Sequence, residues 1–306
     1  MNIVFMGTPD FAVKSLQQII ADGHNVQAVY TKADAPKGRK MILTPSDVKV
    51  CALENNLTVY TPSTFKDEAE VERLKALNPD LIVVVAYGKL LPKSVLDIPK
   101  YGCVNVHGSI LPKWRGAAPI QWTILSGDEY GGVTTMYMNE GLDTGDIIFT
   151  DEVKVGENET SGQLFDRLCI NGANLLSKTI KAIEEGTAPR ISQNDSDATY
   201  ASMLSKEISE IDFSKSAKDV HNKVRGLSPW PSAQTKLFGK RIKILETRLS
   251  DKKGEAGKVI SVNPLTVACC EGSVEILTLQ PEGKRAMSAS DYLKGHNIEL
   301  GTLFGE

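Results

Sequence analysis

The densest group of side chains with chemical potential lies in NVHGSILPKWRGAAPIQW, residues 105–122. Asn105 and His107 stand two residues apart at the end of an apolar run, so in a strand both point to one face, about 6 to 7 Å apart. An amide donor beside an imidazole can stabilise a carbonyl oxygen that becomes negatively charged, and the imidazole can also move a proton. Taken alone, an Asn-x-His pair is more often a turn-forming Asn beside a structural His.

The surrounding residues favour a site over that structural alternative. Gly108 lets the backbone approach a ligand closely, and Ser109 can hydrogen-bond it. Further along, NEGLDTGDII at 139–148 carries Asp143 and Asp146 on a glycine-rich connection between two predicted strands. A carboxylate that reached the imidazole would fix its tautomer and raise its pKa. For either aspartate alone, a hairpin loop rich in turn formers is an adequate explanation.

The elements that position these residues follow an α/β pattern. Apolar runs at 2–7, 25–31, 81–88 and 102–108 predict strands, and amphipathic segments between them predict helices. This alternation is typical of a Rossmann-like, mostly parallel sheet with helices on both faces. The Asn-x-His pair therefore lies at the carboxyl end of a parallel strand, where open α/β sheets bind ligands. Residues 33–43 are predicted as a loop, and Thr44 followed by a proline predicts the start of the next helix.

The pattern changes after residue 131. Two hairpin-type strands precede a long amphipathic helix at 161–186, and a polar, proline-containing stretch follows. Beyond residue 208, a helix at 216–227 and several short strands with turns predict a small antiparallel, OB-like β-barrel. We therefore predict a first domain at 1–189, a linker at 190–208 and a barrel domain at 209–306.

Charge and composition limit the partners. The 306 residues carry a formal net charge of −3, yet residues 215–258 hold 12 basic and 4 acidic side chains. This excess is compatible with a polyanionic partner, although on charge alone a solvated lysine-rich face is the favoured interpretation. The longest apolar run, at 81–88, is too short to span a bilayer, and the N-terminus lacks a basic signal-peptide region, so no membrane is expected and the cytoplasm is the expected compartment. Cysteine and histidine spacing indicates neither a disulfide framework nor a metal site.

Several motifs together resemble the methionyl-tRNA formyltransferase family, within the folate-dependent formyltransferases. In chain order they are GTPDFAV, VVVAYGKLLP, NVHGSILPKWRGAAPIQW and GLDTGDII, while SPWPSAQTKLFGKRIKI and LQPEGKRAMSASDYL resemble the family's C-terminal domain. The resemblance covers nearly the whole chain. It implies that a formyl group passes from 10-formyltetrahydrofolate to the α-amine of methionine on initiator tRNA, with a catalytic domain at 1–189 and a tRNA-binding barrel at 209–306.

The resemblance also implies roles for individual residues. Asn105 and His107 would stabilise the oxygen of the reacting carbonyl, and Asp143 would hold His107 and an ordered water, whereas Asp146 would belong to the loop structure. The implied folate-binding residues are Ser109, Ile110, Leu111, Pro112, Tyr87, Gly88, Leu90 and Leu142. The implied tRNA-binding residues are Lys37, Arg39, Lys40, Lys206, Arg225 and Arg241. Trp230 is expected to pack between helix and barrel, no metal is implied, and a monomer is expected.

Two other functions stay open. A different formyl-transferring or formyl-hydrolysing enzyme could use the same Asn, His and Asp on a nucleotide, a sugar amine or water; the basic loop at 37–40 and the barrel favour tRNA instead. An RNA-binding module with an inert catalytic half is the second alternative, and the intact set of three polar residues argues against it.

Overall fold

The computed structural model describes residues 1–38 and 40–306, and these form two compact units. The first unit comprises Met1–Gly116, Gly132–Val153 and Phe165–Tyr200, and the second comprises Ala117–Gly131, Lys154–Leu164 and Ala201–Glu306. The units interleave along the chain, because two stretches before residue 165 belong to the second unit. The predicted domain limits at 189 and 208 stay a prediction.

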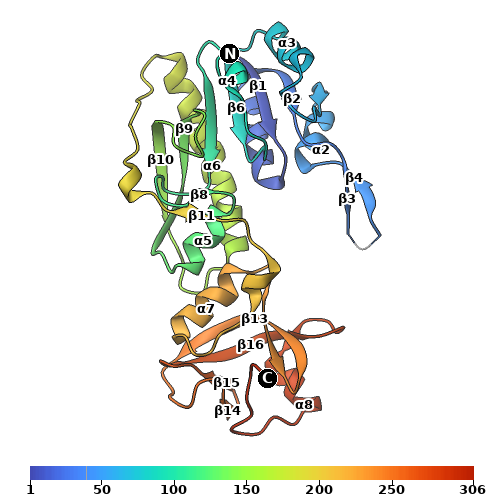
Figure 1. Ribbon diagram of the computed structural model, residues 1–306, viewed down its shortest axis with the longest axis vertical. Coiled ribbons are helices and arrows are strands. Elements are labelled where there is room, and N and C mark those ends of the chain that lie inside the picture. The colour runs from blue at the N-terminus through green and yellow to red at the C-terminus, as the bar shows by residue number, and fades with distance from the viewer. Residues whose placement is uncertain (39) are drawn as a thin grey trace. The chain divides into compact units, whose positions relative to one another are not determined.

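A mostly parallel sheet forms the centre of the first unit (Figure 1). In the described part of the chain it has seven strands in the order β10-β9-β7-β6-β1-β2-β5. Their bounds are β1 Asn2–Gly7, β2 Asn25–Tyr30, β5 Val59–Tyr60, β6 Leu81–Val85, β7 Cys103–His107, β9 Tyr130–Tyr137 and β10 Ile147–Lys154. The strands from β5 to β7 pair in parallel, and β7 pairs with β9 antiparallel. The predicted fold class is confirmed.

Helices cover both faces of this sheet. On one face, α3 (Glu68–Ala76) and α4 (Lys93–Leu96) bury a core with side chains of β1, β2, β6 and β7. On the other, α6 (Ser161–Glu184) packs so closely that a Cβ on Gly172 would lie 3.1 Å from a methyl carbon of Val106. The remaining helical elements of the unit's first half are η1 (Asp10–Ala12), α1 (Val13–Ala21) and α2 (Asp47–Glu54).

The segment predicted as a loop at 33–43 contains a short hairpin instead. Strands β3 (Ala35–Lys37) and β4 (Ile42–Thr44) pair antiparallel, and the hairpin projects from the first unit in Figure 1. Helix α2 begins after Ser46, whose hydroxyl accepts a hydrogen bond from the backbone N–H of Lys49. The predicted cap, Thr44, is therefore two residues too early, because Thr44 and Pro45 precede the helix and Ser46 caps it.

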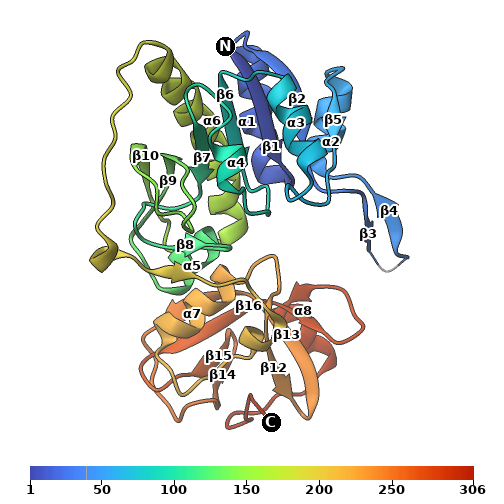
Figure 2. The same cartoon turned by 45° about the horizontal axis from the view of Figure 1, so that its top comes forward.

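The chain that leaves α6 runs back beside β10 (Figures 1 and 2), where Ile191 forms a β-bridge with Ile147. It continues through the 3₁₀ turn η2 (Asp195–Asp197) to β11 (Tyr200–Ala201), which pairs with β8 (Arg115–Gly116). The segment predicted as a linker is therefore, up to residue 200, an ordered part of the first unit.

The second unit contains an antiparallel sheet in the order β12-β13-β16-β15-β14, with β17 paired to β16. The strands are β12 Ala233–Leu237, β13 Lys240–Ser250, β14 Val259–Val262, β15 Leu265–Ala268, β16 Ser273–Pro281 and β17 Met287–Ser288. Residues 301–305 close the sheet into a small barrel, because Gly305 N–H donates to the carbonyl of Lys236 on β12 and Val259 N–H on β14 donates to that of Thr302. The helical elements are α5 (Pro119–Leu125), η3 (Lys206–Ser209), α7 (Ala217–Gly226) and α8 (Ala289–Gly295).

Helix α7 starts with a capping box in which Ser216 and Asp219 satisfy each other's backbone N–H groups. Its buried side chains join the barrel core. Across residues 1–38 and 40–306, the helices are all too short or too polar to cross a membrane.

Candidate active site

Strand β7 places Asn105 and His107 on one face of the sheet, as the alternation predicts. The register pairs Asn105 with Val84 of β6 and Met136 of β9, so the strand end is held on both sides. His107 is 6% exposed. The Oδ1 atom of Asn105 is buried and has no hydrogen-bond partner among the described residues. A buried acceptor without a partner is costly, and such groups are concentrated at functional sites.

The imidazole of His107 faces an acceptor oxygen at each of its two nitrogens. Its Nε2 lies 2.9 Å from the carbonyl oxygen of Trp114, and its Nδ1 lies 3.7 Å from Oδ2 of Asp143. Because a carbonyl oxygen only accepts, Nε2 carries the hydrogen and donates it. Nδ1 is then left with a lone pair that can take a proton in front of the carboxylate. The hydrogen bond to the Trp114 carbonyl thus favours the tautomer with its hydrogen on Nε2, and the role of Asp143 in holding His107 stays a prediction.

Asp143 reaches this position from the loop between β9 and β10. Its Oδ2 accepts a hydrogen bond of 2.8 Å from the backbone N–H of Gly116. Its backbone is in the left-handed region, with φ of 55°, which Asp tolerates better than most residues. Asp146 lies in the same loop and accepts hydrogen bonds from Arg190 and Ser192, as expected of a residue that supports the loop.

The residues predicted to bind folate lie on three loops of the first unit. Ser109 is buried and donates to the carbonyl of Lys113, while Thr134 of β9 donates to the carbonyl of Ser109 and accepts from the N–H of Leu111. This anchors the segment Ser109–Pro112, in which Leu111 is buried, and Ile110 and Pro112 are half-buried.

The other two loops present apolar side chains. Leu90, after β6, is 83% exposed, and Leu142, beside Asp143, is 52% exposed. Gly88 has φ of 71°, and Tyr87 is buried with a hydroxyl that has no partner among the described residues. Burial raises the pKa of Tyr87 to about 12, so the hydroxyl stays protonated and able to donate.

The residues predicted to bind tRNA are in different environments. Lys37 and Lys40 are exposed on the β3–β4 hairpin, and Arg39 lies outside the described residues. Lys206 and Arg241 are exposed in the second unit. Lys215 and Lys240, two further cations of the basic stretch 215–258, are also exposed. Trp230 was expected to pack between helix and barrel, but its side chain is 56% exposed.

Arg225 is the exception among these cations, because it is only 7% exposed. Its Nη1 donates to the carbonyls of Gly156 and Glu159, and its Nε donates to Oδ1 of Asn222. It lines a cavity of about 150 Å³ within the second unit. The guanidinium of Arg225 is thus not exposed for the predicted contact with RNA. Its hydrogen bonds hold residues 156–159 in place instead.

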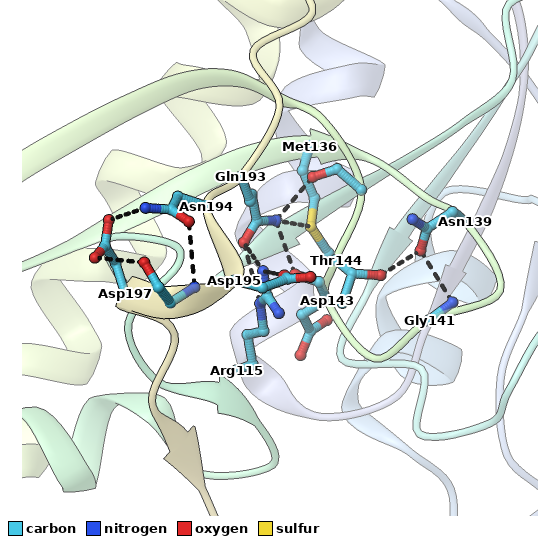
Figure 3. Close-up of polar contacts among 12 residues, drawn as sticks. Arg115, Met136, Asn139, Gly141, Asp143, Thr144, Gln193, Asn194, Asp195 and Asp197 are labelled. Carbon is cyan, nitrogen blue, oxygen red and sulfur yellow. Dashed lines mark hydrogen bonds and ion pairs between the residues drawn. The ribbon is translucent and has the colours of Figure 1, made fainter.

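A further network around Asp143 was not predicted. Figure 3 shows the amide of Gln193 between Arg115 and the Asp143 loop, and Asp195 beside the guanidinium of Arg115. Gln193 belongs to the polar stretch at 190–208 that was predicted as a linker. This stretch has no periodic pattern of apolar residues from which the position of Gln193 could be predicted. The full burial of Arg115, next to the motif residues, comes only from the structure.

Comparison with known proteins identifies the class. A family model described as formyl transferase matches residues 1–180, and one described as formyl transferase, C-terminal domain, matches residues 203–297. The chain therefore belongs to the formyl transferase family, whose donors of the formyl group are folate derivatives.

Individual proteins similar to this chain are known within the family. A methionyl-tRNA formyltransferase of Lachnospira eligens is 48% identical over 315 residues, and one of Clostridioides difficile strain 630 is 48% identical over 309 residues, each with 100% of both chains covered. The fold is shared with the N-formyltransferase of Helicobacter canadensis in complex with folinic acid and dTDP-3-aminofucose. That structure has a TM-score of 0.69 at 21% identity, with 92% of this chain and 99% of the other covered.

Proposed function

We propose that the protein transfers the formyl group of 10-formyltetrahydrofolate to the α-amine of methionyl initiator tRNA, giving the formylated tRNA used in translation initiation. The observation that carries the proposal is the geometry at the end of β7, where the Asn105 amide and the His107 imidazole of the strand meet the Asp143 carboxylate of the β9–β10 loop, and where Oδ1 of Asn105 has no partner among the described residues. The full-length identity to methionyl-tRNA formyltransferases supports the same acceptor.

Within this proposal, 10-formyltetrahydrofolate supplies the formyl group when it is bound. The Asn105 amide donates from Nδ2 to the formyl oxygen, where negative charge develops, and one such donor lowers a barrier by about 3 to 4 kcal/mol. His107 takes at Nδ1 the proton that the α-amine loses as it attacks the formyl carbon, because its Nε2–H is already bonded to the Trp114 carbonyl. The proton then passes to the tetrahydrofolate nitrogen that leaves. The Asp143 carboxylate, 3.7 Å from Nδ1, stabilises the positive charge that this protonation creates.

The chain's residues fit a folate in this place. A pterin ring is flat, with amide-like edges, so it requires apolar contacts together with hydrogen-bonding groups. The exposed side chains of Leu90 and Leu142 offer the first, and the backbone of the anchored segment Ser109–Pro112 offers the second. The unpartnered hydroxyl of Tyr87 is a further donor on the loop after β6.

The tRNA part of the proposal rests on exposed cations. Lys37 and Lys40 on the projecting hairpin, and Lys206 and Arg241 in the second unit, are all exposed. Contacts of this type to phosphates are sequence-independent and sensitive to salt. We assign catalysis to residues 1–189 and most tRNA contacts to residues 209–306. Since the three proposed catalytic residues come from one chain, the protein is proposed to act as a monomer, in the cytoplasm where initiation occurs.

The test is a competition between acceptors. Purified protein is mixed with 10-formyltetrahydrofolate and, in separate reactions, methionyl initiator tRNA, methionyl elongator tRNA, free methionine or a dTDP-amino sugar, and the mass of each acceptor is measured. We expect formyl addition, seen as a gain of one CO, on the methionyl initiator tRNA far faster than on the others. Formylation of the amino sugar, or release of free formate alone, would reject the proposed acceptor.

A further inference from the structure

The side chain of Gln193 joins the Asp143 loop to a buried arginine, although it comes from the chain segment that follows α6. We propose that Gln193 is a positioning residue that holds Asp143 in place in front of His107. This inference rests on the function proposed above, since it assigns a task to a residue that does not itself reach the substrate.

Gln193 uses both ends of its amide. Its Nε2 donates to the carbonyls of Asp143 and Gly145, both at 2.8 Å. Its Oε1 accepts from Nε of Arg115 at 3.1 Å and from Nη2 of the same arginine at 2.8 Å. The opposite orientation of the amide would set NH₂ against a guanidinium and oxygen against two carbonyls, so only one orientation satisfies all four contacts.

Arg115 strengthens this contact. Its side chain is 1% exposed and also forms an ion pair of 2.8 Å with Asp195, so its position is held from both sides. Two N–H groups from a cation polarise the Gln193 amide and make its NH₂ a better donor to the loop carbonyls. The chain of contacts in Figure 3 thus runs from Asp195 through Arg115 and Gln193 to the backbone of Asp143.

The Asp143 loop needs such support. Residues 139–142 are exposed, and Asp143 itself has a left-handed backbone that is unfavourable for a residue with a Cβ. Within the same loop, Gly145 lies so close to Tyr137 that a Cβ on Gly145 would overlap the carbonyl oxygen of Tyr137. Gln193 satisfies the carbonyls on both sides of Thr144 and so fixes the stretch that directs the Asp143 carboxylate toward the Gly116 N–H and His107.

The test separates the two ends of the amide. In Gln193→Glu the side chain keeps its shape and its acceptor contacts with Arg115, but an ionised carboxylate cannot donate to the two carbonyls. We expect kcat for formyl transfer to fall about 10- to 100-fold, because displacing a group by about an ångström has effects of that size. KM for both substrates should stay within about twofold. Ser196→Ala is the matched control from the same segment, since the Ser196 hydroxyl contacts only Asp197 among the described residues.

A second readout does not depend on activity. The ¹⁵N chemical shifts of the His107 ring, assigned by comparison with His107→Gln, report the charge in front of Nδ1 in the protein without substrates. They should change in Gln193→Glu and stay as in the wild type in Ser196→Ala, with unfolding temperatures of both variants near the wild-type value. An unchanged kcat or unchanged His107 shifts in Gln193→Glu would overturn the proposal. A wild-type protein that formylates none of the acceptors would reject the proposed function instead, and the NMR comparison would still decide the role of Gln193.

Discussion

Replacing Asn105 with leucine should separate activity from stability. The Oδ1 atom of Asn105 is buried without a partner among the described residues, and an unsatisfied acceptor of this kind destabilises a fold by about 1 to 3 kcal/mol. Leucine has the same branching at Cγ and no polar atom. Asn105→Leu therefore removes the penalty and adds apolar burial next to the side chains of β6 and β9.

The two effects have opposite signs and measurable sizes. For a domain of about 150 to 250 residues, each kcal/mol changes the unfolding temperature by about 2 to 4 °C, so a rise of about 2 to 12 °C is expected. At the same time, the loss of the Nδ2 donor should reduce kcat about 10²- to 10³-fold. Differential scanning fluorimetry gives the first value, and formyl transfer to methionyl initiator tRNA gives the second.

The matched control is Asn171→Leu on α6. Asn171 is also a half-buried asparagine of the first unit, but its Nδ2 donates to Oδ2 of Asp151 at 2.7 Å. Its replacement should lower the unfolding temperature and leave kcat unchanged. If Asn105→Leu unfolded at a lower temperature than the wild type, the acceptor would not be a liability. If it kept wild-type turnover, Asn105 would not be the donor to the formyl oxygen.

Three further predictions concern other parts of the chain. His107→Gln should reduce kcat about 10²- to 10⁴-fold without changing the Kd for tRNA, since proton transfer contributes that much. His221 is buried, and burial lowers its pKa in the folded protein. Below about pH 6.5 the unfolded chain therefore binds a proton at this residue more readily than the folded protein does, so the protein loses stability as the pH falls. The unfolding temperature of His221→Gln should thus fall less than that of the wild type between pH 7.5 and 5.5. Reversing two exposed charges, in Lys240→Glu with Arg241→Glu, should weaken tRNA binding and make the slope of log K against log salt shallower by about 1 for each phosphate that the variant no longer binds.

A different result would contradict each of these three predictions. Weaker tRNA binding by His107→Gln would give His107 a binding role. Equal pH dependence of unfolding in His221→Gln and the wild type would mean that His221 protonates equally in both states. The matched control for the charge reversal is Lys75→Glu on α3, which should leave the salt slope unchanged. The same change in slope for all exposed lysines would indicate a general charge effect and no defined tRNA surface.

Local patterns predicted the frame of the site. The run before Asn105 is apolar and short, and its alternation places Asn105 and His107 on one face and Val106 on the other; the structure has this arrangement, with Gly172 of α6 against Val106. The strands of the barrel were also visible, because each has its own apolar alternation and turn. What closes that barrel was not visible, since residues 301–305 act through backbone hydrogen bonds that leave no pattern in side chains.

Charge counting failed at one position for a related reason. Arg225 lies in the most basic stretch of the chain, and a count treats all its cations as equal. The structure places Arg225 under the carbonyls of Gly156 and Glu159, about 66 to 69 residues away in sequence. Whether such a residue is buried depends on which distant segment packs against its helix. The amphipathic pattern of the residues around Arg225 does not predict that segment.

The two amides near His107 differ in a way that separates their tasks. Gln193 forms four hydrogen bonds with nitrogen and oxygen atoms of the protein, and a group saturated in this way can hold its neighbours but has nothing left for a ligand. Asn105 has an acceptor, Oδ1, with no partner among the described residues, which weakens the fold and leaves that oxygen free to accept a hydrogen bond from a ligand. Tyr87, with its unpartnered hydroxyl, belongs with Asn105 by the same criterion. Unpartnered buried atoms also occur away from this site, as at Ser209 and Thr235 in the second unit, so the position of Asn105 beside His107 on β7, and not its lack of a partner alone, assigns its amide to the substrate.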